Sequence, residues 1–242
     1  MQRPIAVFDS GVGGLCLLKK ARQLLPQEDF LYFADNKNVP YGNKSQSQIE
    51  MLVEQNLQKI FLHNPKVVLI GCNTVTATCL SSLQKQYPNV LFVGTLPSVD
   101  KCKKPCLVFA TQASINSVGF GHLSKQKDVF LLALKQGAQM IESGCSNDDF
   151  KKYLDYILSG INLYSFGSMV LGCTHYLYKR KVFESFGLPV FDNLNQVATQ
   201  LVDALQFKNL CKNSKVRGGV SFFLSDNSAS EYKKYMNFYR KA

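Results

Sequence analysis

Short runs of apolar residues recur along the chain, and most of them end at a glycine or at small polar residues. Runs of this length and content are typical of buried strands in a parallel sheet. We expect such strands at 5–8, 30–34, 66–71, 90–94, 106–110, 128–134, 168–172, 188–192 and 220–224.

Between these runs lie stretches whose apolar side chains recur at helical spacing, which is the pattern of amphipathic helices. We expect helices at 17–25, 45–63, 77–87, 147–158, 195–205 and 230–240. Strands that alternate with helices in this way predict an α/β fold with mainly parallel sheets.

The two halves of the chain repeat one order of parts: a strand, a polar turn, and a later strand that ends at a cysteine. This order predicts two pseudo-symmetric α/β lobes, with a boundary near Pro97. A strand at 220–224 needs a sheet to pair with, so we expect it to return to the first lobe. The predicted lobes are therefore 1–97 plus 207–242, and 98–206.

Two of the expected strands end at a glycine that is followed at once by a cysteine. Residues 67–74 have the sequence VVLIGCNT, and residues 169–176 have the sequence MVLGCTHY. Because ligands bind at the carboxyl ends of parallel strands, Cys72 and Cys173 are predicted to face a shared cleft between the lobes. Two facing thiols can racemise a carbon centre without a cofactor: one thiolate removes a proton, and the other thiol returns one to the opposite face.

Such chemistry also needs groups that tune the thiols and hydrogen-bond donors that stabilise the developing enolate. Asp9 and His175 are the charged neighbours within these motifs, and Glu142 is a third candidate. The neutral hydrogen-bonding candidates are Ser10, Tyr41, Asn73, Thr74 and Thr174. No lysine has a local context that marks it as a Schiff-base residue for pyridoxal phosphate, so we expect no cofactor.

Each motif taken alone leaves other interpretations open. Either cysteine could be buried filler. Cys173 and His175 could be the nucleophile and base of a hydrolase, or a fragment of a metal site, although there is no C-x-x-C motif and the chain has only 3 histidines. The glycine turn at 9–15 has the pattern G-x-G-G, which is neither a dinucleotide fingerprint nor a Walker P-loop.

Composition narrows the class of protein. Hydrophobic residues make up 46% and charged residues 19%, which argues against a disordered chain, and the apolar runs are too short to span a membrane. The 8 cysteines, several of them within apolar strands, favour a reduced cytoplasmic setting over a disulfide framework. The net charge of +11 would suit nucleic acid or a small anionic substrate, but the lysines are scattered, so nucleic acid is not favoured as the main partner.

The full set of motifs resembles the cofactor-independent glutamate racemases of the aspartate/glutamate racemase superfamily. The resemblance rests on five segments in family order: FDSGVGGL at 8–15, ADNKNVPYG at 34–42, GCNT at 71–74, FATQASINS at 109–117 and LGCTHY at 171–176. They occur at family-like spacing and are spread over nearly the whole of residues 5–206.

The resemblance implies a site between two lobes, in which Cys72 and Cys173 are the acid/base thiols, one for each enantiomer. It implies that Asp9, His175 and Glu142 assist the thiols, and that no metal or cofactor takes part. The implied substrate-binding residues are Asp9, Ser10, Tyr41, Gly42, Asn73, Thr74, Thr174 and His175. It also implies a cytoplasmic homodimer that supplies D-glutamate for peptidoglycan synthesis.

The chain departs from the family pattern at several places. Thr95 precedes Leu96 and Pro97 where the family has I-E-P, Leu177 replaces a proline, and Ser114 replaces a threonine. Residues 192–194, Asp-Asn-Leu, replace D-S-A. Two alternatives to a glutamate racemase remain: an aspartate or related amino-acid racemase, and a regulatory binding protein on the same fold.

Overall fold

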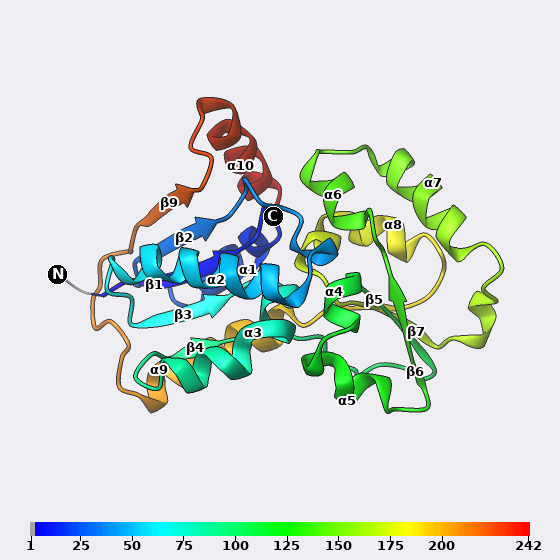
Figure 1. Cartoon of the computed structure of the whole chain (residues 1–242), viewed down its shortest axis with the longest axis horizontal. Coiled ribbons are helices and arrows are strands. Elements are labelled where there is room, and N and C mark those ends of the chain that lie inside the picture. The colour runs from blue at the N-terminus through cyan, green and yellow to red at the C-terminus, as the bar shows by residue number, and fades with distance from the viewer. Residues whose placement is uncertain (1–2) are drawn as a thin grey trace.

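The strands form two separate parallel sheets, one in each lobe of the molecule (Figure 1). The computed structural model describes residues 3–242. The first sheet has the order β4-β3-β1-β2-β9, and its strands are β1 (Ile5–Asp9), β2 (Phe30–Ala34), β3 (Val67–Ile70), β4 (Phe92–Val93) and β9 (Val220–Leu224). The second has the order β6-β5-β7-β8, and its strands are β5 (Cys106–Ala110), β6 (Val129–Ala133), β7 (Ser168–Leu171) and β8 (Val190–Phe191).

The two sheets share one topology. The order β4-β3-β1-β2 in the first lobe corresponds strand for strand to β8-β7-β5-β6 in the second. Strand β3, which precedes Cys72, is therefore the counterpart of β7, which precedes Cys173. The predicted α/β fold of two pseudo-symmetric lobes is confirmed, and β9 extends the first sheet beyond the shared part.

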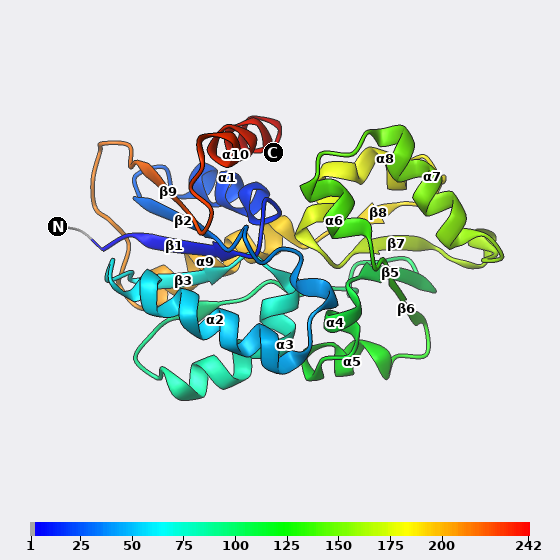
Figure 2. The ribbon, with the colours of Figure 1, turned by 45° about the horizontal axis from the view of Figure 1, so that its top comes forward.

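Helices cover both faces of the first sheet because its strands are apolar on both sides. In β1, Ile5 and Val7 point into one core, whereas Ala6 and Phe8 point into the other. The first core is covered by α1 (Gly14–Leu24), α9 (Leu194–Phe207) and α10 (Ala229–Lys241), and the second by α2 (Gln46–Phe61) and α3 (Asn73–Gln86). Figure 2 shows α1 and α2 on opposite sides of β1.

The second lobe is built in the same way, and most of its helices are shorter. Its α-helices are α4 (Gln112–Ile115), α5 (Gly121–Ser124), α6 (Gly137–Glu142), α7 (Asn147–Leu158) and α8 (Arg180–Glu184). The 3₁₀ helices of the molecule are η1 (Tyr41–Asn43), η2 (Val118–Phe120), η3 (Leu163–Ser165) and η4 (Thr174–Lys179). None of the helices within 3–242 is long and apolar enough to cross a membrane.

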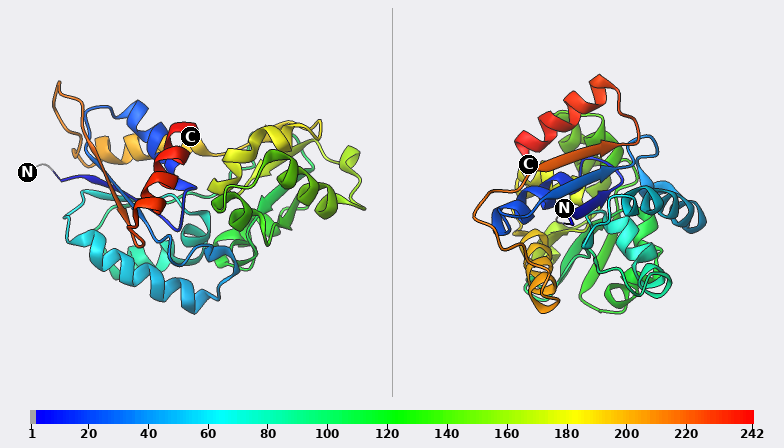
Figure 3. Two further views of the ribbon diagram at one scale, coloured as in Figure 1. Left: turned by 90° about the horizontal axis from the view of Figure 1, so that it is seen from above. Right: turned by 90° about the vertical axis from the view of Figure 1, so that its left-hand side faces the viewer.

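The returning C-terminal strand pairs as expected. Strand β9 runs parallel to β2, with Val220 opposite Phe30 and Leu224 opposite Ala34. The chain then enters α10, which Figure 3 shows on the first lobe, on the side nearest the second lobe.

Helix α9 packs differently from the expected lobe division. Its buried side chains Val197, Leu201 and Leu205 belong to the same core as β1 and α1. From the sequence, 194–206 was expected in the second lobe. The structure differs because no local pattern says which sheet an amphipathic helix covers. We infer that the chain returns to the first lobe near Asn193 rather than near residue 207.

Helix α3 begins earlier than expected, at Asn73 rather than at residue 77. The β-branched residues Thr74, Val75 and Thr76 weaken the helical signal of the first turn. Burial of these side chains against the lobe core overrides that preference. As a result Cys72 caps the helix in an extended conformation, and Asn73 and Thr74 lie in its first turn.

Candidate active site

The two cysteines lie at equivalent switch points of the two sheets. In the first sheet the chain passes from β1 to β2 on one side and then to β3 on the other, so Asp9 and Cys72 flank the switch. In the second sheet the same switch lies between β5 and β7, beside Thr111 and Cys173. A switch point at the carboxyl edge is the usual ligand site of an open α/β sheet.

Cys72 is buried, and burial favours its neutral thiol. Its side chain is 6% exposed, and its Sγ atom is 3.5 Å from Ser10 Oγ. Burial raises the pKa of Cys72 to about 12, and the nearby Asp9 charge adds to this. Hydrogen bonds to the thiolate from Ser10 and from the backbone N–H of Val75 act in the opposite direction.

Cys173 has a basic neighbour that Cys72 lacks. Its Sγ atom lies 3.9 Å from His175 Nδ1, and His175 Nε2 lies 2.9 Å from Glu142 Oε2. Burial opposes the charged imidazole, but Cys173 and Glu142 outweigh that effect, so the pKa of His175 is well above its usual value. The pKa of Glu142 is lowered: burial raises it, but His175 and the backbone N–H of Val12 outweigh burial.

Asp9 connects the two lobes. Its Oδ1 atom accepts a 2.8 Å hydrogen bond from the backbone N–H of Gly11, and its Oδ2 atom accepts one of 3.4 Å from Thr174 Oγ1. Burial raises the pKa of Asp9 to about 6, although the positive charge on His175 lowers it.

The glycine turn after β1 brings the two lobes into direct contact. A Cβ atom on Gly13 would lie 2.5 Å from Thr174 Oγ1 and 2.7 Å from His175 Nδ1. A side chain there would hold the lobes apart. The missing side chain lets the turn of the first lobe pack directly against the LGCTHY segment of the second.

Hydroxyl groups also meet across the lobes. Thr74 Oγ1 lies 2.9 Å from Thr111 Oγ1, which is 2.8 Å from Ser114 Oγ. Ser114 therefore keeps the hydroxyl of the threonine that the family has at its position. Gly42 packs against the same group, since a Cβ there would be 2.6 Å from Thr111 Cβ.

Tyr41 is fixed by a buried carboxylate that the sequence analysis did not single out. Its hydroxyl donates a 2.5 Å hydrogen bond to Asp35 Oδ2, and Asn56 Nδ2 donates to the same oxygen at 3.0 Å. Tyr41 is 1% exposed and belongs to the same buried cluster as Cys72.

Asn73 is distinguished by an unused donor. Within 3–242, its Nδ2 atom is the buried side-chain nitrogen or oxygen that has no hydrogen-bond partner. A buried amide without a partner is costly, and such groups are rare away from functional sites. The first turn of α3 around it also has backbone N–H groups that lack intrahelical acceptors.

Two further residues reach the site from the C-terminal helix. Tyr235 OH donates to Glu142 Oε1 at 3.2 Å, and Lys234 Nζ lies 3.3 Å from the same oxygen. Neither residue was among the site residues expected from the sequence. No local pattern connects α10 with Glu142.

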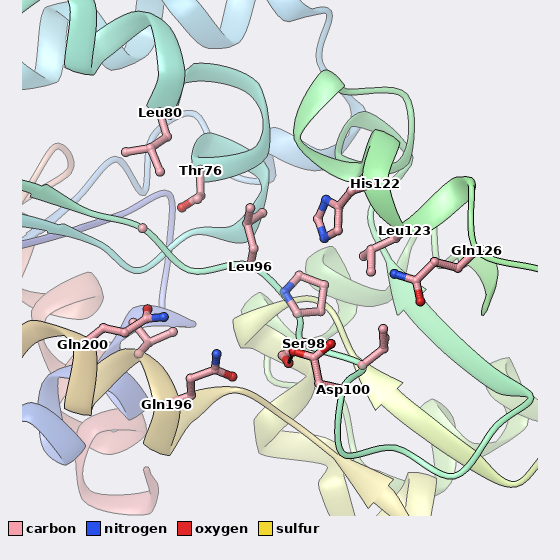
Figure 4. A pocket seen from close by; sticks show the side chains of 14 residues that line it. Thr76, Leu80, Leu96, Ser98, Asp100, His122, Leu123, Gln126, Gln196 and Gln200 are labelled. Atoms are coloured by element: carbon pink, nitrogen blue, oxygen red, sulfur yellow. Dashed lines mark hydrogen bonds between the residues drawn. The ribbon is translucent and has the colours of Figure 1, made fainter. Parts of the chain in front are cut away.

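The structure thus brings all the predicted site residues to the facing edges of the sheets. By contrast, a cavity of about 330 Å³ lies at the crossovers between the lobes, lined by Leu96 and Ser98, by His122 from α5 and by Gln196 and Gln200 from α9 (Figure 4). None of the predicted site residues lines it. The candidate active site is closed, because both thiols are only 6% exposed.

The chain is similar in sequence to known proteins over nearly its whole length. No family model matches the chain. It is 32% identical over 250 residues to glutamate racemase 2 of Bacillus subtilis strain 168, which covers 95% of this chain and 94% of that protein. It is 30% identical over 250 residues to the glutamate racemase of Halothermothrix orenii strain H 168, and this match covers 98% of this chain and 99% of that protein.

Among solved structures, the chain is similar to glutamate racemase from Francisella tularensis subsp. tularensis SCHU S4 in complex with D-glutamate. The TM-score is 0.87 and the identity 26%, over 99% of this chain and 94% of that one. Since similarity in sequence and in fold extends over almost the whole length, the chain belongs to the glutamate racemase family.

Proposed function

We propose that this chain interconverts L- and D-glutamate by proton transfer between Cys72 and Cys173. The observation that carries the proposal is the equivalence of the two thiols. Each follows the strand beside the switch point of its own sheet, and both are buried where the lobes meet. Burial is the main cause of the raised pKa of Cys72, and a charge on Cys173 raises it further, so the two thiols are near enough to influence each other.

The reaction needs one thiolate and one thiol at a time. The thiolate removes the proton from Cα, and the electron pair of that C–H bond moves into the enolate of the α-carboxylate. The second cysteine gives its S–H proton to the opposite face of Cα and becomes the thiolate. The product is the other enantiomer, and the protonation states of the two cysteines have been exchanged.

The carboxylates of glutamate need donors, and the donors lie on both lobes. Asn73 Nδ2, which has no partner within 3–242, and the free N–H groups at the start of α3 are the proposed donors of the first lobe. Thr174 and the hydroxyl cluster around Thr111 supply donors from the second. The binding of D-glutamate by the Francisella protein supports glutamate as the ligand.

The lobes must separate for substrate to enter. Thiols that are 6% exposed cannot receive an amino acid while the hydroxyl and glycine contacts between the lobes are closed. Two crossovers, at 94–105 and 192–193, connect the lobes, and Asn193 Nδ2 donates to the backbone oxygen of Leu96. These crossovers are the expected hinge.

Three expectations from the family resemblance stay predictions: a homodimer, a cytoplasmic location and a supply of D-glutamate to peptidoglycan synthesis. An aspartate racemase would use the same thiols with a shorter substrate. Family membership favours glutamate, and a direct comparison of the two substrates decides between them.

Replacing either thiol should abolish racemisation. Cys72→Ser and Cys173→Ser should each lower kcat by about 10²- to 10⁴-fold or more, because a serine hydroxyl is far less acidic than a thiol. Circular dichroism of L- and D-glutamate, and of both aspartates, measures the rates. Cys79→Ser, a change at a buried cysteine within α3, is the matched control and should keep wild-type activity. Full activity in either site variant contradicts the proposal, and a preference for aspartate would correct the substrate.

Asn73→Ala should separate binding from stability. We expect kcat/KM for glutamate to fall by about 10- to 150-fold, as for a lost hydrogen bond to a charged group. The free energy of unfolding in urea should not fall, because the amide nitrogen has no partner to lose. Asn56→Ala is the contrast: its amide bonds Asp35 and the backbone oxygen of Leu52, so it should lose stability. A less stable Asn73→Ala protein with unchanged kinetics would count against the substrate role.

The raised pKa of Asp9 should make the free energy of unfolding depend on pH. Burial raises it from 3.8 in the unfolded chain to about 6, so the native state binds this proton more tightly. Stability from this group is therefore present below about pH 4 and is lost as the pH rises through about 6. Asp9→Asn should raise the free energy of unfolding by about 3 kcal/mol at pH 7 and change it little at pH 4.

Urea unfolding at both pH values measures this, with the exposed Asp203→Asn as control, which should stay within about 0.5 kcal/mol of wild type. A gain for Asp9→Asn that is equal at pH 4 and pH 7 would mean that the ionisation of Asp9 is not its cause.

A further inference from the structure

Helix α10 reaches from the first lobe to the proton-transfer machinery of the second. Tyr235 is fully buried, and its hydroxyl bonds Glu142 Oε1. Lys234 Nζ lies 3.3 Å from that oxygen and 2.9 Å from Glu231 Oε2. The other carboxylate oxygen of Glu142 is occupied by His175 Nε2 and by the N–H of Val12. The Glu142 carboxylate is thus held from three separate parts of the chain.

These contacts form a continuous path to one thiol. Lys234 contacts Glu142, Glu142 contacts His175, and His175 Nδ1 is 3.9 Å from Cys173 Sγ. The Cys72 thiol instead bonds Ser10. We propose that Lys234 and Tyr235 are positioning residues that hold Glu142 and, through Glu142, the imidazole of His175 beside Cys173. The inference rests on the proposed function and adds a role for α10 within it.

The electrostatic sign follows from the charges that surround Glu142. The groups that contact Glu142 or share a charge interaction with it are His175 and Tyr178 from η4, Lys234 and Tyr235 from α10, Asp9 from β1, and Tyr32 from β2. Glu231 of α10 lies beyond Lys234 and pairs with it. Cys173 in turn faces His175, Tyr176 and Cys72. Among these groups the cations are Lys234 and protonated His175.

Removal of a positive charge makes every nearby acid harder to ionise. Without Lys234, the Cys173 thiol should therefore release its proton at higher pH. Lys234 is 30% exposed, so solvent screens its charge and the effect should be moderate. Tyr235 adds a buried hydrogen bond that holds the carboxylate in place when Lys234 is exchanged.

The test compares three variants of one helix in the full-length protein. Lys234→Met should lower kcat for glutamate at pH 7 by about 2- to 5-fold, the effect of one partly exposed charge pair, and leave KM unchanged. The acid limb of its kcat profile should move to higher pH. Lys234→Arg should restore both. Lys233→Met, at the exposed neighbouring position, is the matched control and should behave as wild type.

A second readout does not depend on racemisation. The pH dependence of iodoacetamide alkylation at Cys173, measured by mass spectrometry, should shift to higher pH in Lys234→Met, while the profile of Cys72 shifts less. Identical profiles for Lys234→Met and Lys233→Met would overturn the inference, as would an arginine variant that fails like methionine. If the wild type does not racemise glutamate, the proposed function fails, and the alkylation profiles alone decide whether Lys234 acts on Cys173.

Discussion

The facing of two parallel sheets, carboxyl edge to carboxyl edge, is the constraint on which the rest of this structure depends. Neither sheet alone could hold a carbon atom between two thiols, because each brings one cysteine to its switch point. The lobes can approach closely since Gly13 and Gly42 have no side chain where they meet Thr174 and Thr111. A repeated fold and a few glycines thus create a site with matched groups on both faces.

The symmetry of the backbone does not extend to the electrostatics. Cys173 lies in a chain of contacts with His175 and Glu142, whereas Cys72 has Ser10 and a helix N–H as its partners, with Asp9 nearby. The equilibrium constant between two enantiomers in water is unity whatever groups catalyse the reaction, so the two thiols need not have identical surroundings. Different surroundings can therefore serve the same proton transfer in the two directions, and α10 can act on one side only.

The sequence predicted those features that local patterns encode. Apolar runs ending in G-C located β3 and β7, and the repeated order of parts predicted the paired lobes. It did not predict the lobe of α9, whose apolar stripe would suit either sheet. Nor could it connect Tyr235 to Glu142, 93 positions apart, because only the folded core brings them together. Glu142 was named as a third charged candidate, but its contacts with His175 and Val12 depend on the folded structure and could not be read from its own segment.

The most direct test of the two-thiol account follows single proton transfers. Protiated L-glutamate is incubated with the enzyme in D₂O, and deuterium at Cα is measured in both enantiomers during the first few per cent of conversion. With two bases, the D-glutamate formed carries deuterium from the start, and the remaining L-glutamate keeps its proton. Deuterium that enters L-glutamate as fast as D-glutamate forms would show that one base serves both faces, and would contradict the account.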